Sequence, residues 1–282
     1  MELVIESGYA GCSVENLMKP LISLLLLAAS SVAADAPFYV FDNGLGSTEL
    51  SLDQQAELAR QAGYAGIFYS GTKNIPSLLA ACQSRGLRVL GIYTGMDMSK
   101  PNASYDPGLP EAIQQLNGTG ALITFTVNGK AAGTDEIAVP VIRAVARMAA
   151  AAGLKVALYP HFGFYVARIE DALRLRQKAG AENVGLVFNL CHWLRSGDGN
   201  HLDERLTQAL PYTFMVSVNG ADPEGDWDRL IQPLDRGTYD VRGFVSKLRS
   251  MGYKGPFALQ CYNVKGDRAE NLTRSMNSWR KF

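Results

Sequence analysis

The chain has 282 residues, 47% of them hydrophobic, and a formal net charge of +0. This length and composition suit one large domain with a sizeable core, because α/β barrels of about 250 residues usually form a single domain. The balanced charge argues against nucleic acid as a partner, and no pair of the 4 cysteines has metal-ligand spacing.

Residues 18–34 have the features of a secretory signal peptide. A basic start at Lys19 precedes a short apolar stretch, and small residues follow up to the expected cleavage point after Ala34, with Ala33 and Ala36 as alternatives. The apolar stretch is too short to span a bilayer comfortably, so we expect a protein that is exported to the periplasm or secreted and is not membrane-bound after cleavage. The charged residues in 1–17 are the acidic Glu2, Glu6 and Glu15, unlike the basic start of a signal peptide. We predict that they are a non-native extension; a buried N-terminal helix is the alternative.

Residues 35–282 alternate two patterns along the chain. Short runs of β-branched or aromatic residues predict strands. The strands are expected at Phe38–Asp42, Ala65–Tyr69, Arg88–Tyr93, Ala121–Val127, Lys155–Tyr159, Val184–Asn189, Thr213–Val218 and Phe257–Tyr262. Longer stretches with helical periodicity lie between them, and glycine closes most of these stretches. The helices are expected at Leu52–Gln61, Pro76–Ser84, Leu109–Leu116, Glu136–Ala152, Ile169–Lys178, Glu204–Ala209, Val241–Ser250 and Asn271–Trp279.

Strands that alternate with helices in this way favour parallel pairing through right-handed crossovers. The predicted strands have almost no polar alternation, which is typical of strands buried on both faces. No complete glycine-rich phosphate turn follows the first strand, as an open dinucleotide-binding sheet would require. The sequence therefore predicts an α/β fold with a single (β/α)₈ TIM barrel, whose last helix closes the barrel from below.

Polar residues gather where the predicted strands end, which is where barrels of this kind carry their active sites. On the later strands these polar residues share one parity, so their side chains share one face of the sheet. We therefore predict an uncharged, polar binding site for a small-molecule sugar, whose hydroxyls need partners that both donate and accept. The predicted substrate-binding residues are Asp42, Tyr69, Tyr93, Asn128, Tyr159, Asn189, Trp193, Ser217, Asn219 and Gln260.

Three residues are candidates for the chemistry itself. His161 and His192 follow two neighbouring strands, and imidazoles serve as acids and bases near neutral pH. Lys130 follows the fourth strand and could polarise a carbonyl oxygen. Trp193 and Trp227 follow the sixth and seventh strands and could stack on a sugar ring, or simply pack in loops.

The sequence resembles the xylose isomerase-like TIM-barrel family, which includes sugar phosphate isomerases and epimerases. The resemblance covers the chain from Asp35 onward. It rests on the segments Gly63–Ile67, Tyr159–His161, Asn189–His192, Gly237–Asp240 and Gly252–Pro256. It implies a divalent metal held by Glu, Asp, His and Glu at the ends of the fifth to eighth strands.

All four of those ligands are replaced in this chain, by Tyr159, Asn189, Ser217 and Gln260. Hard divalent cations are held by anionic oxygens, and three negative charges have been lost. The cofactor is therefore left unknown: the family's divalent metal is disfavoured, and His161 with His192 offers only a weak alternative site.

Three functions are compatible with these features. The first is an exported isomerase or epimerase that moves a proton next to the carbonyl of a free or oxidised sugar, or a lyase or hydratase that acts on keto-sugar derivatives. The second is a non-catalytic sugar-binding barrel. A nuclease fits least, because the charge is neutral and the metal carboxylates are missing. The sequence leaves the oligomeric state open.

Overall fold

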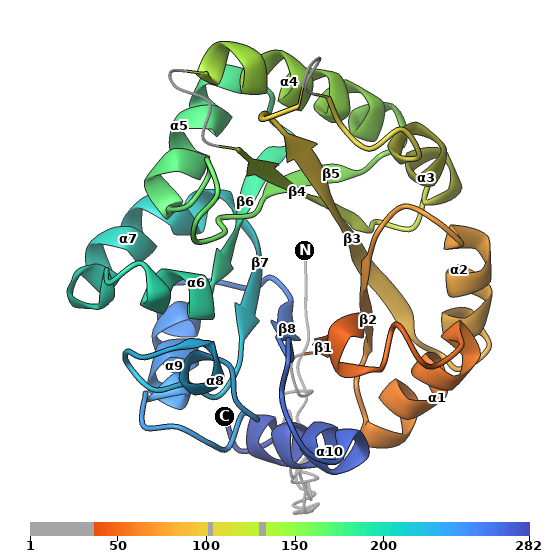
Figure 1. The fold of residues 1–282 in the computed structure, drawn as a ribbon, viewed down its shortest axis with the longest axis vertical. Helices are drawn as coiled ribbons and strands as arrows, with labels where there is room; N and C mark the ends of the chain where they lie inside the picture. Colours follow the sequence, from red (N-terminus) through yellow and green to blue (C-terminus); the bar gives the residue numbers. More distant parts are fainter. Residues whose placement is uncertain (1–36, 101–103, 130–133) are drawn as a thin grey trace, which may run out of the picture. The chain divides into compact units, whose positions relative to one another are not determined.

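In the computed structural model, which describes residues 37–100, 104–129 and 134–282, eight parallel strands form one closed barrel (Figure 1). Each strand pairs with its neighbours in the sequence, and the first strand pairs with the last. The predicted single (β/α)₈ barrel is thereby confirmed. The strands are β1 (Phe38–Phe41), β2 (Gly66–Ser70), β3 (Arg88–Asp97), β4 (Leu122–Asn128), β5 (Lys155–Leu158), β6 (Val184–Asn189), β7 (Thr213–Val218) and β8 (Phe257–Leu259).

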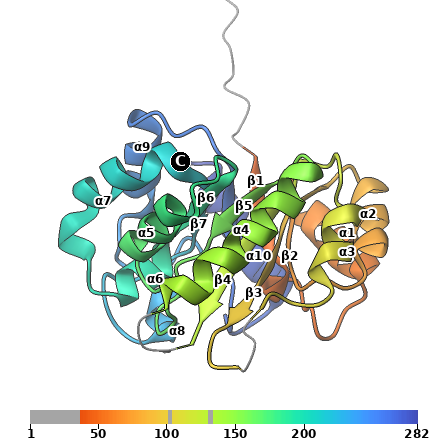
Figure 2. The same ribbon diagram turned by 90° about the horizontal axis from the view of Figure 1, so that it is seen from above.

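Helices surround the barrel on its outside, as the views along and across it show (Figures 1 and 2). The ring contains α1 (Leu52–Ala62), α2 (Ile75–Gln83), α3 (Leu109–Gln115), α4 (Asp135–Ala151), α5 (Ile169–Ala179), α7 (Leu202–Ala209), α9 (Val241–Ser250) and α10 (Arg268–Trp279). Two short helices that the sequence patterns did not predict lie in the connections after β6 and β7: α6 (Leu190–Arg195) and α8 (Trp227–Leu230). Both are shorter than two full helical turns, so they leave no periodic signal.

Local sequence signals explain where the regular helices begin and end. In α1, the Ser51 side chain accepts a hydrogen bond from the Gln54 amide, and the Gln54 side chain accepts one from the Ser51 amide. This capping box satisfies two amides that the first turn leaves free. Gly63 ends the helix with a φ of 90°, in the left-handed region that a residue with a Cβ rarely adopts.

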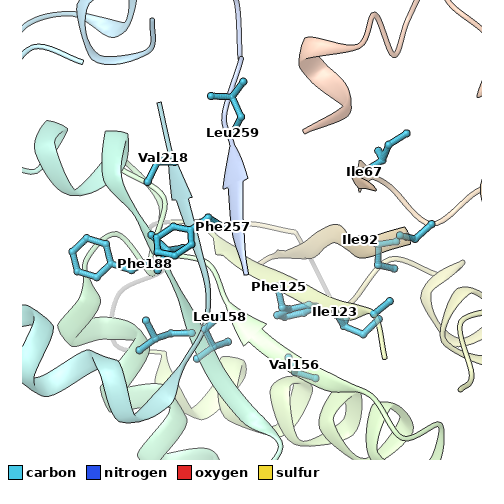
Figure 3. Close-up of a cluster of buried hydrophobic side chains, with 14 of the residues drawn as sticks. Ile67, Ile92, Ile123, Phe125, Val156, Leu158, Phe188, Val218, Phe257 and Leu259 are labelled. Carbon is cyan, nitrogen blue, oxygen red and sulfur yellow. The ribbon is translucent and has the colours of Figure 1, made fainter. Parts of the chain in front are cut away.

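The strands separate two layers of buried side chains. One layer fills the barrel interior with residues of one strand parity: Tyr39, Phe41, Phe68, Leu90, Leu122, Ala157, Tyr159, Val187, Met215 and Ala258. The other parity points outward and packs under the helices, as the labelled side chains in Figure 3 illustrate. The barrel is therefore a packed core rather than a pore, and a ligand can reach it only at an end.

The last helix differs from the expectation that it would close the barrel from below. It lies beside α1 and takes the eighth place in the outer ring (Figure 1). Trp279 of α10 stacks on Phe38 of β1 with ring centroids 4.1 Å apart and an angle of 10° between the planes. The Trp279 ring also contacts Phe257 of β8, with centroids 5.2 Å apart, so the apolar face of this amphipathic helix covers the outside of β1 and β8.

The predicted signal peptide and extension, residues 1–34, lie outside the described residues. Among the helices of the described ranges, none combines the length and the apolar character needed to cross a membrane.

Candidate functional site

A cavity of about 600 Å³ opens at the carboxyl ends of the strands. This is the end at which (β/α)₈ enzymes hold their substrates. Hydrogen-bonding and aromatic side chains line it, and among the described residues no aspartate, glutamate, lysine or arginine does. The lining consists of Phe41, Asn43, Ser70, Tyr93, Tyr159, His161, Phe162, His192, Trp227, Ile231, Gln260 and Tyr262.

Two imidazoles stand side by side in the wall of this cavity. The ring centroids of His161 and His192 are 4.0 Å apart. His161 follows β5 and stacks on Phe164 at 3.9 Å, and His192 lies in α6 with its ring 5.2 Å from that of Trp227. Aromatic neighbours therefore hold both rings in place.

Burial favours the neutral form of both histidines. Burial lowers the pKa of His161 from its ordinary value, because the charged form loses its hydration. Burial also holds the pKa of His192 well below its usual range, and the nearby His161 adds to this shift. A neutral imidazole has one nitrogen that accepts a proton and one that donates a hydrogen bond, so the pair can provide both functions.

Tyr159 is the centre of a buried polar network beneath the imidazoles. Its hydroxyl receives hydrogen bonds from the Nδ2 atom of Asn189 and, at 3.5 Å, from the Nε2 atom of Gln260. Ser217 is buried beside the same hydroxyl. Burial raises the pKa of Tyr159 well above its ordinary value, so the phenol stays protonated.

Asn189 connects this network to the helix that carries His192. It is the N-cap of α6, and its Oδ1 atom accepts hydrogen bonds from the His192 amide at 3.4 Å and the Cys191 thiol at 3.1 Å. The Asn189 side chain makes its hydrogen bonds in the cap of α6 and with Tyr159, and it does not line the cavity. It therefore positions His192 rather than a substrate.

Gln260 ties the network to the cavity rim. Its Oε1 atom accepts hydrogen bonds from the amides of Cys261 and Tyr262 at 2.9 Å and 3.0 Å. The Nδ2 atom of Asn43 also donates to it, at 2.7 Å. This amide oxygen is therefore fully engaged, while other parts of the side chain face the cavity.

These residues do not fit the divalent metal that the family resemblance implies. The four side chains at the expected ligand positions are uncharged, and those of Tyr159, Asn189 and Gln260 are hydrogen-bonded to one another. Sites for hard cations depend on anionic oxygens for their affinity. Within the ranges that the structure describes, no three His, Cys, Asp or Glu residues are grouped so that they could hold a metal ion. His161 and His192 alone supply two neutral nitrogens.

The structure brings together part of the predicted site. The cavity is lined by five of the predicted residues: Tyr93, Tyr159, His161, His192 and Gln260. Trp227, a candidate for stacking on a sugar ring, also lines it. Asn189 and Ser217 lie in the network beneath it. Lys130 falls outside the described residues.

Other predicted binding residues do not line the cavity. Asp42 accepts hydrogen bonds from the Ser70 amide and hydroxyl at 2.8 Å and 2.7 Å. Tyr69 and Trp193 pack into the layer between strands and helices. The Asn219 Nδ2 atom donates to the Gly220 and Leu230 carbonyls, which stabilises the loop that carries Trp227. Asn128 accepts from the Gly129 amide at 2.7 Å and does not line the cavity.

Sequence reasoning missed several lining residues. Ser70 shares strand parity with Phe68, which points into the barrel, so the correct parity of β2 would have selected Ser70 in place of Tyr69. Phe162 and Ile231 lie in loops, where no periodicity predicts the direction of a side chain. Phe41 and Tyr262 complete the aromatic part of the lining.

Comparisons with known proteins place this geometry among relatives. Residues 56–282 match the model of the family described as xylose isomerase-like TIM barrel. A 3-dehydroshikimate dehydratase of Pseudomonas aeruginosa is 28% identical over 161 residues, which are 54% of this chain but only 25% of that protein. The chain thus spans about a quarter of the length of this curated relative.

Similar solved structures agree in fold at low sequence identity. The 3-keto-D-glucoside 4-epimerase of E. coli has a TM-score of 0.72 and 16% identity, over 87% of this chain and 99% of that one. A D-allulose 3-epimerase from Methylomonas sp., solved in complex with D-allulose, has a TM-score of 0.70 and 14% identity, over 88% and 97%. With a family model that matches most of its length, the chain belongs to the xylose isomerase-like TIM barrel family.

Proposed function

We propose that this protein is an exported isomerase or epimerase that moves a proton next to the carbonyl of a free or oxidised sugar. The observation that carries the proposal is the pair of neutral imidazoles, 4.0 Å apart, in the wall of the strand-end cavity. A general base must be unprotonated at the working pH, and burial keeps both histidines in that form.

The remainder of the cavity suits a polyhydroxylated ligand. Asn43, Ser70, Tyr93 and Gln260 are neutral groups that can meet hydroxyls. Trp227 offers an aromatic face to the apolar side of a sugar ring. The volume of about 600 Å³ accommodates a small sugar together with a substituent.

The chemistry needs no charged side chain in the ground state. The base takes a proton from the carbon beside the carbonyl, the C–H bond breaks, and its electron pair moves onto the carbonyl oxygen. Return of a proton to the neighbouring carbon, together with transfer of the hydroxyl proton there to the former carbonyl oxygen, gives the isomer, whereas delivery of a proton to the opposite face of the same carbon gives the epimer. A hydrogen-bond donor near the oxygen stabilises the negative charge that develops there.

A lyase is the second candidate, favoured by the similarity to the 3-dehydroshikimate dehydratase. Its first step is the same loss of a proton beside a carbonyl. The electron pair then expels a hydroxyl from the neighbouring carbon, and the hydroxyl leaves as water once it gains a proton. Both reactions therefore require the same two histidines.

Export remains a proposal that rests on the signal-peptide features of residues 18–34. Phosphorylated sugars are mostly cytoplasmic, so an exported enzyme would meet free or oxidised sugars. N-terminal sequencing of the protein recovered from the periplasm or the medium tests this part. A mature start at Asp35 supports it, and an uncleaved protein retained in the cytoplasm contradicts it.

The activity is tested by incubating the purified protein with a panel of aldoses, keto-sugars and 3-keto-glycosides in deuterium oxide. Proton NMR then follows deuterium incorporation beside the carbonyl and the appearance of isomers or of dehydrated products. Incorporation that His161→Ala or His192→Ala abolishes supports the proposal. A ligand that binds without exchange or turnover would point to a sugar-binding barrel instead.

A further inference from the structure

A tight turn fixes the backbone next to the imidazole pair. The Phe164 amide donates to the His161 carbonyl at 3.0 Å, which closes a four-residue turn with Phe162 and Gly163 at its centre. Gly163 has a φ of 86°, whereas Phe162 keeps a negative φ. This combination defines a type II turn, in which the third residue needs a left-handed conformation.

The backbone of Phe162 contacts both imidazoles. Its N–H donates to the Nδ1 atom of His192 at 3.2 Å, and its carbonyl oxygen lies 3.0 Å from the Nδ1 atom of His161. Within the described residues, neither histidine uses its Nε2 atom in a hydrogen bond, and both side chains line the cavity. The two Nε2 atoms are thus the ones left for a ligand.

These two contacts require opposite proton positions. An N–H can donate only to a bare nitrogen, so Nδ1 of His192 is unprotonated and its Nε2 carries the hydrogen. A carbonyl oxygen accepts only from a protonated nitrogen, so Nδ1 of His161 carries the hydrogen and its Nε2 is bare. In a neutral imidazole, the partner of one nitrogen decides the state of the other.

We infer that the Phe162 backbone holds His161 and His192 in opposite tautomers, so that His161 acts as the base and His192 as the hydrogen-bond donor. This division of roles rests on the proposed proton-transfer function. The His161 Nε2 atom forms the new N–H bond as the C–H bond breaks. The His192 Nε2–H group donates to the carbonyl oxygen, where negative charge collects, and keeps its own proton.

A neutral imidazole is a suitable donor for this purpose. It stabilises the enolate by a hydrogen bond without becoming a cation first. The low-dielectric wall around His192 keeps it in that form. Phe162 is accordingly a positioning residue that acts through its main chain.

The tautomers can be measured without any substrate. Nitrogen-15 labelling of the histidines and long-range proton–nitrogen correlation distinguish protonated from bare ring nitrogens, and the variants His161→Gln and His192→Gln assign the signals. We expect hydrogen on Nδ1 of His161 and on Nε2 of His192. The same tautomer in both rings, or the reverse pair, overturns the inference even if the protein is an active enzyme.

The role of the backbone is tested by comparing Phe162→Pro with Phe162→Ala. Proline is favoured at the second position of a type II turn, so Phe162→Pro keeps the turn but removes the N–H that His192 needs. Phe162→Ala removes the ring and keeps the N–H. We expect Phe162→Pro to lose the Nε2–H form of His192 and to exchange deuterium about tenfold more slowly than Phe162→Ala. Equal tautomer spectra in two folded variants contradict the role of this backbone.

The assignment of roles is tested by glutamine substitutions. The terminal amide of Gln occupies nearly the position of Nε2 and donates a hydrogen bond, but it cannot take up a proton. His192→Gln should therefore retain clearly more exchange activity than His192→Ala, whereas His161→Gln should lose about 10²–10⁴-fold, as His161→Ala does. The opposite ranking overturns the assignment. If no sugar is turned over by the wild type, the proposed function fails, and the tautomer spectra alone decide the inference.

Discussion

Asn43, just after the first strand, donates a hydrogen bond to Gln260, just after the last strand, with 2.7 Å between Nδ2 and Oε1. The contact joins residues 217 positions apart in the sequence. It links the two ends of the barrel sheet at the level of the cavity. The backbone pairing of β1 with β8 closes the barrel, and this amide oxygen adds a side-chain link across the same joint at the edge of the site.

Replacing Gln260 with leucine should therefore destabilise the protein. Three N–H donors lose their acceptor, and leaving buried donors unsatisfied costs about 3 kcal/mol in total after water has compensated part of the loss. Gln260→Glu is the matched comparison: at a pH low enough to keep the new carboxyl protonated, it still offers an acceptor to these donors, so we expect a smaller loss than in Gln260→Leu. Chemical denaturation of both variants measures the difference, and equal stabilities would contradict the role of this oxygen.

Removal of the Tyr159 hydroxyl should affect both stability and activity. In Tyr159→Phe, the Asn189 and Gln260 amides lose a shared acceptor, at a cost of about 1–3 kcal/mol. Asn189 then loses a restraint that positions His192. Tyr64→Phe is the control, because Tyr64 donates to the Leu272 carbonyl at 2.9 Å, away from the cavity. Thermal unfolding should detect both losses, whereas deuterium exchange should fall only in Tyr159→Phe.

The two tryptophans should respond differently to a bound sugar. Trp227 lines the cavity, whereas Trp193 packs against Phe188 and Tyr239 in the outer layer. Trp227→Leu should weaken sugar binding about tenfold, because a stacking face worth roughly 1.4 kcal/mol is lost. It should also abolish any change in tryptophan fluorescence on binding. Trp193→Phe should leave both unchanged, and a fluorescence change that depends on Trp193 would contradict this placement.

Asp42 should make the stability depend on pH in an unusual direction. Burial raises the pKa of its carboxyl, and this effect outweighs the hydrogen bonds from Ser70. The folded state therefore binds the proton more tightly than the unfolded state, so the stabilisation is complete below the unfolded pKa and is lost as the pH rises through the folded pKa.

Asp42→Asn removes this titration and keeps one oxygen to accept from the Ser70 amide. The melting temperature of the variant, relative to the wild type, should therefore rise as the pH is raised from about 4 towards neutrality. A difference that stays constant or falls over that interval would show that Asp42 does not have a raised pKa.

The fold could be predicted from the sequence because each β/α unit carries its own signals. Runs such as Leu122–Val127 mark buried strands, and glycines such as Gly63 mark the helix ends. The strand ends could also be found, and with them His161, His192 and Gln260. These predictions needed only local periodicity and the rule that active sites lie at the carboxyl ends of barrel strands.

The remaining parts of the site depend on side-chain directions that no local sequence pattern predicts. Asn189 ends a strand as expected, but it caps the unpredicted helix α6 and so turns away from the cavity. The parity of β2 was ambiguous, since Phe68, Tyr69 and Ser70 are all compatible with either face. The contacts of Phe162 arise from its main chain, so its side chain gives no hint of them.

The uncharged lining of the cavity has a consequence for selectivity. Among the described residues, no charged side chain lines the cavity itself, although Arg195 lies behind the rings of Phe162 and Trp227, 5.5 and 5.6 Å from their centroids. An anion such as a phosphate ester would therefore lose hydration there without a direct counter-ion, which is unfavourable. A neutral polyol merely exchanges water for amide and phenol partners. Ionic strength should consequently have little effect on the affinity of a neutral ligand. We expect ligand selectivity to follow from the free energy of dehydration and not from attraction between charges.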